Sequence, residues 1–592
     1  MNKFIPQYSV KKDTYQICLS EDADFIELAN FRVVIKEEIC FRKTSGEIEI
    51  FVNFDVYQLG KKIKSLNIPN VEFEQFKWVG SKLGLKGEIN TIGITSKVND
   101  HLIRAIKKYN PNVPVINIFS RVGYIKESGS NRKFLFNNGS VSSNGIKYES
   151  KTKLHTKLGF YQIPLDLDVN SYLELSVKKV FNLLNLSKKN RFIGLVPCLA
   201  AFRASTTLFK SMEMDTWFFL VGKTQTYKTT VAQLCTSFYG TLESANNMVS
   251  WDSTDYALIE LALQARNGIL VVDDFVYNVN SGKAKEFTDK AETILRACAN
   301  GSSRSRKDSK GDSIEDKGRI NTMTIATGEF APNGVNESLL ARGIFVPFVR
   351  GDIDQNTLTR FQGYAENGDF VKVNIAFIQY LLINRIELND KIKDWKKTYR
   401  EKLMVRLQQS SPRTVNQAVG MLIAWKLFLM FAKLEGVIDK QEAIKYQKIV
   451  KSRLVSLLKK QRAIYTRSIG SILFESLRDA LKEGRMHLID HKVGGEPQVK
   501  DSSTLGWKHG QPQGTKIGWY NVKTGTIFID KDLPIEDLVA LIPDNYKKDF
   551  NKPFWKKLDR AKLIVHPYDR LVSRAKLFGT DKQHYQLRQP EK

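Results

Sequence analysis

The sequence predicts a mixed α/β protein with a parallel sheet at its centre, covered by helices on both faces. Four short apolar runs recur along the middle of the chain, at residues 217–221, 269–272, 323–326 and 344–348. Such runs are typical of parallel strands buried on both faces, because strands with one solvated face alternate apolar and polar residues. The stretches between the runs can hold the crossover helices that parallel strands require.

The 592 residues are enough for about three or four domains. Changes in composition divide the chain into a β-rich N-terminal domain (1–150), an α/β core (151–350), a basic helical insert and lid (351–465) and a small mixed domain (466–592). In the first domain, β-branched segments such as Phe31–Lys36 and Ile48–Asn53 predict half-buried strands, and the Gly-, Asn- and Ser-rich stretch Ser128–Gly145 predicts hairpin loops. No pattern there indicates catalytic chemistry.

The composition predicts that the chain folds and that it belongs in the reducing environment of the cytoplasm. Hydrophobic residues make up 42% of the chain, and its five cysteines are scattered without a CxxC pair, which argues against disulfides and zinc. The N-terminus is broken by Pro6, Lys11 and Lys12 and does not resemble a signal peptide. The longest apolar run, Ala418–Ala432, is short and contains Lys426, so we expect a buried helix rather than a membrane span.

The formal net charge of +28 predicts an anionic partner. The excess is uneven: residues 391–469 hold 19 lysines or arginines against five acidic residues, and residues 551–592 hold 11 against four. Nucleic acid fits this composition because neutralising phosphates releases counterions. The alternative is a generally basic surface whose lysines are simply solvated.

A phosphate-binding loop is predicted after the first apolar run, because Gly222, Lys228 and Thr229 have the spacing GxxxxxK[ST]. Loop N–H groups would bind phosphate oxygens, the lysine would neutralise the β and γ groups, and the threonine hydroxyl would coordinate Mg²⁺. The residues expected to bind ATP are Gly222, Lys223, Thr224, Gln225, Thr226, Tyr227, Lys228, Thr229 and Thr230. Tyr227 occupies a position usually held by glycine, which is favoured where φ is positive.

Two aspartates end the second apolar run, 45 residues after Lys228. Asp273 and Asp274 would therefore lie at the carboxyl end of a buried strand, where doubly wound sheets bind their ligands. Asp273 would hold Mg²⁺ directly or through water. Asp274, in a position more often held by glutamate, would polarise the attacking water. The alternative is a pair of turn residues.

Three further residues are candidates for ATP hydrolysis. Thr327 ends the third apolar run and could contact the γ-phosphate or the attacking water, with Glu329 close by. Arg342 precedes the fourth run and could reach the nucleotide of a neighbouring subunit as an arginine finger. Arg413 opens a helix and could contact the γ-phosphate from a lid. The alternatives are an ordinary strand exit and two solvated arginines.

Two segments are predicted to contact DNA. Arg304, Arg306, Lys307 and Lys310 lie among small residues in a loop suited to backbone phosphates. No aromatic residue lies among them to stack on bases, which favours sequence-independent binding, and the alternative is a solvated loop. Near the C-terminus, a helix at Ser468–Glu483, strands at Ile517–Val522 and Thr526–Asp530, a helix near Pro553–Arg560 and a possible last strand at His584–Arg588 suggest a winged helix-turn-helix.

In this order, the motifs resemble those of AAA+ ATPases. The segment Trp251–Glu260, together with Asn300–Arg304, resembles a narrower group, the MCM-like initiator and replicative helicases of mobile genomic islands, including those of staphylococcal cassette chromosome elements. The resemblance extends over about residues 120–430, with a looser fit at the C-terminus. It implies a hexameric ring with ATP between subunits and with pore hairpins that grip single-stranded DNA.

The resemblance also implies a role for each motif. Lys228 and Thr229 match Walker A, Asp273 and Asp274 match Walker B, Arg304–Lys310 match the pore hairpin, Thr327 matches sensor 1, Arg342 matches the finger and Arg413 matches sensor 2. Tyr227 and Asp274 depart from the commonest motifs, which bears on the rate of hydrolysis more than on nucleotide binding.

The expected function is that of an ATP-driven ring helicase and initiator that translocates on single-stranded DNA, binds duplex DNA through its C-terminal domain and replicates a mobile element. One alternative is an ATP-switched protein that melts or remodels an origin without processive unwinding. Another is a DNA-binding protein with an inactive ATPase. A primase–helicase is disfavoured, because residues 1–150 lack paired carboxylates beside a histidine.

Overall fold

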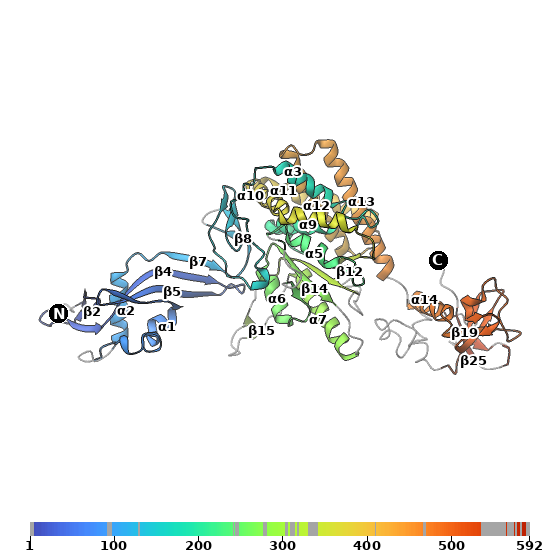
Figure 1. Ribbon diagram of the computed structural model, residues 1–592, viewed down its shortest axis with the longest axis horizontal. Helices are drawn as coiled ribbons and strands as arrows, with labels where there is room; N and C mark the ends of the chain where they lie inside the picture. The colour runs from blue at the N-terminus through green and yellow to red at the C-terminus, as the bar shows by residue number, and fades with distance from the viewer. Residues whose placement is uncertain are drawn as a thin grey trace.

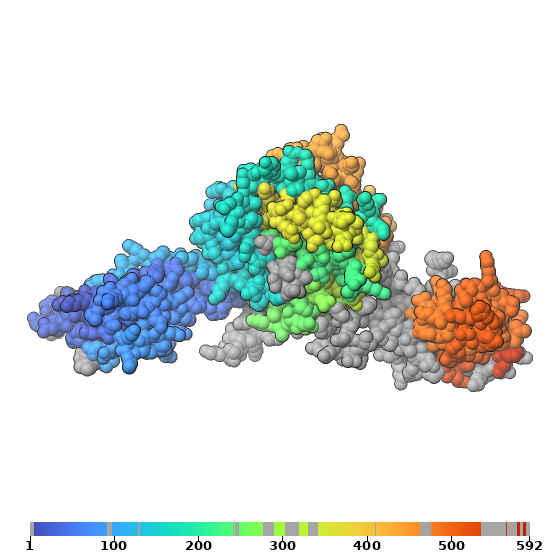
Figure 2. All heavy atoms as spheres, viewed as in Figure 1, coloured from blue at the N-terminus to red at the C-terminus, as the bar shows by residue number. Residues whose placement is uncertain are grey.

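The computed structural model describes residues 5–91, 97–127, 131–240, 242, 248–275, 281–301, 306–307, 314–315, 319–329, 341–408, 410–465, 469–533, 564, 573–574, 577–579 and 583–587. Of residues 281–288, 306–307, 314–315, 462–465, 469–473, 475, 573–574 and 583 it describes the backbone alone. The chain is elongated, with the blue N-terminal region and the orange C-terminal region at opposite ends of a larger central body (Figure 1, Figure 2).

The N-terminal region is β-rich. Its elements are β1 (Gln7–Lys11), β2 (Thr14–Cys18), β3 (Ile26–Ala29), β4 (Arg32–Arg42), β5 (Ile48–Gln58), β6 (Lys61–Pro69), α1 (Asn70–Gln75), α2 (Val98–Tyr109) and β7 (Val115–Phe119). Strands β6-β5-β4-β7 form one sheet and β1-β2-β3 another. Val52, Phe54 and Val56 alternate along β5 and are buried in one cluster with residues of α1 and α2.

A small antiparallel sheet joins this region to the central body. It contains β8 (Gly123–Lys126), β9 (Arg132–Leu135), β10 (Ser140–Ser142) and β11 (Gly145–Lys147), in the order β11-β10-β9-β8. Phe134, Phe136 and Val141 are buried in the central hydrophobic cluster, not in the N-terminal one. The domain boundary near residue 150 stays a prediction, and this sheet packs with the residues that follow it.

The central body contains a five-stranded sheet of β12 (Trp217–Val221), β13 (Val249–Ser250), β14 (Ile269–Phe275), β17 (Met323–Gly328) and β18 (Gly343–Pro347). The order is β13-β14-β17-β12-β18, and every pair is parallel, which confirms the predicted mixed α/β fold with a parallel sheet. All six residues of β17 are buried, so both faces of this strand are covered.

Helices surround this sheet and form a block above it (Figure 1). They are α3 (Leu173–Leu183), α4 (Leu195–Ser205), α5 (Lys228–Thr236), α6 (Asp255–Gln264), α7 (Ser281–Asn300), α9 (Gln355–Glu366), α10 (Asp369–Ile383), α11 (Arg385–Arg406), α12 (Pro412–Leu434) and α13 (Lys440–Tyr465). Helix α12 is long and apolar enough to cross a membrane, but 83% of its most apolar window is buried inside the protein. It forms the core of the helical block, as the sequence predicted for Ala418–Ala432.

The C-terminal region has its own hydrophobic cluster. It contains α14 (Ile469–Lys482), β19 (Met486–Asp490), β20 (Trp507–Lys508), β21 (Gln511–Pro512), β22 (Thr515–Asn521), β23 (Thr526–Asp530), β24 (Ser573–Arg574) and β25 (Gln583–Leu587). Five of the strands form one sheet in the order β19-β22-β23-β25-β24, which is larger than the predicted hairpin. The helix expected near Pro553–Arg560 lies outside the described residues, so the winged helix stays a prediction.

Candidate functional site

The loop after β12 lies where the strand order of the central sheet reverses. Strand β12 lies between β17 and β18, and the chain visits β13, β14 and β17 on one side before it reaches β18 on the other. Open parallel sheets bind ligands outside the carboxyl ends of their strands at such a point. Gly222 begins the loop, and a Cβ there would lie 2.2 Å from the carbonyl oxygen of Phe348. Only glycine therefore lets the loop pass this close to the residue after β18.

Tyr227 has the backbone conformation that glycine would favour at its position. Its φ is 65° and its ψ is 21°, in the left-handed region, and α5 begins at the next residue. A non-glycine residue adopts this conformation at a cost of about 1 kcal/mol. The Tyr227 side chain packs against the central hydrophobic cluster, which offsets part of that cost. The tyrosine thus leaves the loop in a glycine-like backbone geometry.

Lys228 is held across the loop. Its Nζ donates to the carbonyl oxygen of Lys223 (2.9 Å) and to Thr226 Oγ1 (3.4 Å). Burial lowers the pKa of Lys228, and the neighbouring carboxylates of Glu329, Asp273 and Asp274 raise it. The ammonium therefore lies among acidic groups at the open end of the loop.

Glu329 also contacts the loop directly. The amide of Thr224 donates to Glu329 Oε1 (3.2 Å), and the Thr224 hydroxyl donates to the same oxygen. Glu329 follows β17, so this contact ties the loop after β12 to the exit of the neighbouring strand. Its proximity was expected from the sequence, whereas its bonds to Thr224 were not.

Thr229, Asp273 and Thr327 meet at the carboxyl ends of β14 and β17. The Thr229 hydroxyl donates to Asp273 Oδ1 (3.0 Å) and Oδ2 (3.2 Å), and the Thr327 hydroxyl donates to Asp273 Oδ1. Hydroxyl and carboxylate oxygens are ligands that Mg²⁺ accepts in phosphate sites. The donor set of Thr229 and Asp273 therefore fits the predicted Mg²⁺, which would also need phosphate and water oxygens to complete its coordination.

Asp274 does not belong to the buried part of β14. The chain has an irregularity between Val272 and Phe275, Asp274 has a φ of 66°, and its side chain is exposed. Its amide donates to Thr327 Oγ1 (3.1 Å). Partial burial and the charges of Asp273, Asp252 and Glu329 raise the pKa of Asp274, and Lys228 lowers it. Asp252 follows the two-residue strand β13, which is too short to leave a sequence pattern.

Substitution of Asp274 by asparagine should stabilise the metal-free protein at neutral pH. A raised carboxyl pKa means that the folded state disfavours the charged form, so the penalty is full above the folded pKa and absent below the unfolded value of about 3.9. The Tm of Asp274→Asn in EDTA should therefore exceed that of the parent protein at pH 8, and the difference should vanish as the pH falls to about 4. Equal melting curves of the two proteins at pH 8 would show that the acidic residues do not crowd Asp274.

Arg342 and Arg413 do not lie at this site. Gly343 pairs with Trp217, so Arg342 precedes β18 at the amino end of the sheet, a strand length of roughly 16 Å from the loop after β12. Arg342 is buried, and its Nε donates to Asn300 Oδ1 (3.0 Å). Arg413 is exposed in the first turn of α12, and Gln417 one turn later donates to the carbonyl oxygen of Ala341 (2.7 Å). Both arginines therefore lie at the amino end of the sheet, whereas the loop after β12 lies at its carboxyl end.

The predicted DNA-binding loop is described only in part. Arg306–Lys307 form β15, which pairs antiparallel with β16 (Ile314–Glu315), so a two-stranded hairpin precedes β17. Arg304 and Lys310 lie outside the described residues, as do the side chains of Arg306 and Lys307. The contact of these four residues with DNA stays a prediction.

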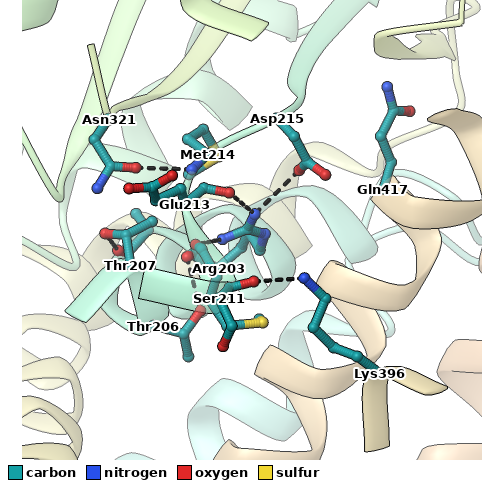
Figure 3. A network of polar contacts seen from close by, with 12 residues as sticks. Arg203, Thr206, Thr207, Ser211, Glu213, Met214, Asp215, Asn321, Lys396 and Gln417 are labelled. Atoms are coloured by element: carbon teal, nitrogen blue, oxygen red, sulfur yellow. Dashed lines mark hydrogen bonds and ion pairs between the residues drawn. The ribbon is translucent and has the colours of Figure 1, made fainter. Parts of the chain in front are cut away.

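A cavity of about 530 Å³ lies at the amino end of β12, away from the loop. The buried Arg203 in its wall donates to the carbonyl oxygens of Met212 (2.6 Å) and Glu213 (2.7 Å) and forms an ion pair with Asp215 (3.0 Å) (Figure 3). Lys396 of α11 donates to the carbonyl oxygen of Ser211 (2.6 Å). These bonds fix the segment that leads into β12, so this part of the cavity wall has a structural role.

Comparisons with known proteins agree with this fold. Residues 183–317 match a family described as a domain of unknown function, DUF927, a range that contains the loop after β12 and both aspartates. No curated protein sequence matches the chain. A structure of the SCCmec type IV Cch active helicase is similar over 98% of this chain and 96% of that chain, with a TM-score of 0.51 and 13% identity. This similarity shows that the chain has the fold of a helicase structure.

A full-length MCM homolog from Methanopyrus kandleri is similar more distantly. The match spans 61% of this chain and 86% of the homolog, with a TM-score of 0.30 and 11% identity.

Proposed function

We propose that this protein is an ATP-dependent DNA helicase and replication initiator that works as a ring. The observation that carries the proposal is the convergence of Thr229, Asp273 and Thr327 beside the Lys228 loop at the switch point of a parallel sheet. A strand, a glycine-begun loop and a helix N-terminus are the parts that bind a triphosphate, and an acidic strand end supplies the second half of the site. The fold shared with a helicase structure supports the same function.

Each group at the site has a chemical task in this proposal. The loop amides and the Lys228 ammonium bind the β- and γ-phosphates, which orients the γ-phosphate toward Asp274 and Thr327. Mg²⁺, held by Thr229 and Asp273, would neutralise charge that develops on the phosphate oxygens. The Asp274 carboxylate accepts a hydrogen bond from the attacking water and orients it. The Thr327 hydroxyl accepts a hydrogen bond from the Asp274 amide, which holds the backbone that carries this carboxylate.

The position of the two arginines favours an oligomer. Arg342 and Arg413 lie at the opposite end of the sheet from their own loop, so they can act on ATP only if a second copy presents them to it. A head-to-tail interface that repeats this contact forms a ring when the rotation between neighbouring subunits closes. The hexamer remains part of the proposal, as do translocation on single-stranded DNA and a role in replicating a mobile element.

The decisive experiment measures ATP hydrolysis with and without single-stranded DNA, followed by strand displacement on a forked duplex. Stimulation of hydrolysis by DNA would link the phosphate site to the basic charge of the chain. Displacement of the strand would distinguish a helicase from an ATP switch that melts an origin without unwinding. A protein that binds DNA but neither hydrolyses ATP nor responds to it would favour the inactive ATPase instead.

Neutralising the hairpin before β17 should weaken binding of single-stranded DNA. The variant replaces Arg304, Arg306, Lys307 and Lys310 by glutamine. Loss of four phosphate contacts should lower the slope of log K against log salt by about 3, because each contact to a single strand contributes roughly 0.7. Fluorescence anisotropy over a salt series measures this slope. An unchanged slope would remove the hairpin from the DNA path.

A further inference from the structure

A cationic surface lies on the helical block, far in sequence from the hairpin before β17. Five residues recur at helical spacing along one side of α11: Lys391, Trp395, Tyr399, Lys402 and Arg406. This side borders α12, whose Lys426 has its Nζ 3.8 Å from the centre of the Trp395 ring. Tyr399 continues the surface to α13, because its Oη accepts a hydrogen bond from Gln447 (2.9 Å).

We name Lys402, Arg406, Lys426 and Lys451 the lid patch. Lys451 belongs to α13, and the cations that lower its pKa, after burial, are Arg406 and Lys402. Burial also lowers the pKa of Lys426, and so do Lys391 and Lys402. Lys402 thus lies close enough to repel both Lys426 and Lys451, and Arg406 lies close enough to repel Lys451, although these residues come from three helices.

The lid patch has no acidic counterpart among the described residues. Within the part of the chain that the structure describes, its four members form no ion pair, and every charge that shifts the pKa of Lys426 or Lys451 is positive. The other side of α11 differs: Lys393 pairs with Asp390 (3.0 Å), and Lys397 and Arg400 line the cavity that contains Glu213, Asp215 and Glu401. On the lid-patch side, the ion pair between Lys391 and Glu387 balances the charge at the start of α11, so the uncompensated charge begins at Lys402.

We propose that the lid patch binds the phosphate backbone of DNA, as a contact separate from the hairpin. Lys402 and Arg406 lie about 6 Å apart along α11, and Lys426 and Lys451 add charges from two further helices, so the patch fits several backbone phosphates rather than a single small anion. Lys426 covers the Trp395 ring, so the aromatic residues are engaged with a cation and the contact is to the backbone, independent of base sequence. This inference rests on the proposal that the chain acts on DNA.

The test compares two variants that lose the same charge. The first replaces Lys402, Arg406 and Lys451 by glutamine. The control replaces Lys393, Lys397 and Arg400 by glutamine, on the other side of α11. Anisotropy with a labelled single strand and with the matching duplex, over a KCl series, gives the salt slope of each full-length protein.

The patch variant should lose about 2 units of slope on single-stranded DNA or about 3 on duplex, since three phosphate contacts are removed. At 0.1 M salt its affinity should fall about tenfold or more, and the control should change by less than half as much. A loss confined to one DNA form assigns the patch to that form. Arg406→Gln alone, at an exposed residue, should lose about 0.7 to 0.9 units and keeps the test valid if the triple variant unfolds.

Two results would overturn the inference. In the first, the patch variant keeps the parent slope. In the second, the control loses as much slope as the patch variant, which would indicate a general effect of net charge. If the hairpin variant still weakens binding in either case, the proposed function stands and only the lid patch fails. If the unaltered protein binds no DNA, the proposed function itself fails.

Discussion

Lys228→Ala should reduce ATP turnover by about 10²–10³-fold or more, because the ammonium is the positive charge that the loop presents to the phosphates. Lys228 Nζ already lies over the loop, bonded to the Lys223 carbonyl oxygen and to Thr226. Alanine removes this charge and leaves Glu329, Asp273 and Asp274 facing the triphosphate without compensation. A steady-state phosphate-release assay measures the loss.

Lys223→Ala is the matched control for this variant. It removes a lysine side chain from the same loop but keeps the Lys223 carbonyl oxygen that accepts the Lys228 hydrogen bond. Turnover of the control should stay within a few-fold of the parent rate, because Lys223 takes part in the loop through its backbone, which alanine keeps. If Lys228→Ala hydrolyses ATP as fast as Lys223→Ala, the loop after β12 is not the triphosphate site.

The central sheet could be predicted because its strands are buried on both faces. Four of its five strands are apolar runs that stand out in the sequence, and each was expected at its place. The fifth, Val249–Ser250, has two residues and exists only because Val249 pairs with Val272 of β14. Its exit positions Asp252 near Asp274, so this influence on the Asp274 pKa could not be read from the sequence.

Local chemistry predicted where elements begin, but it did not predict which end of the sheet they reach. Ser411 and Pro412 indicate the start of a helix, and the Ser411 hydroxyl indeed accepts the amide of Thr414 (3.2 Å). Whether Arg413 can contact a γ-phosphate from a lid depends instead on packing over long sequence distances. Gln417 packs against Ala341, which holds the first turn of α12 at the amino end of β18.

Tyr227 shows the same limit for a single residue. The spacing from Gly222 to Lys228 predicts a phosphate-binding loop. Because Tyr227 replaces the usual glycine, the sequence did not settle the backbone conformation of the loop at this position. Tyr227 can adopt the left-handed backbone conformation because α5 begins at the next residue and the tyrosine side chain packs against the central hydrophobic cluster. Propensity alone disfavours this conformation, and tertiary packing overrides it.

Arg342→Ala should lower the rate of ATP hydrolysis by about 10³-fold or more while ATP still binds, because a finger stabilises charge that develops in the transition state. The variant keeps Lys228 and Thr229 of the phosphate loop and Asp273 of β14, so binding of a fluorescent ATP analogue should change little. Since Arg342 is buried and bonds Asn300, a structural role is the competing explanation. A large fall in Tm along with the loss of turnover would favour the structural role.

Mixing two inactive variants separates these explanations. In a ring formed from equal amounts of Arg342→Ala and Lys228→Ala protomers, an interface is complete when the first supplies the loop and the second supplies the arginine. About a quarter of interfaces meet this condition if the protomers assort at random around a head-to-tail ring, so the mixture should recover up to about a quarter of the parent rate. An arginine that only supports its own fold cannot be replaced from another subunit. A mixture as inactive as its two components would therefore place Arg342 outside the catalytic interface, even if the ring itself assembles.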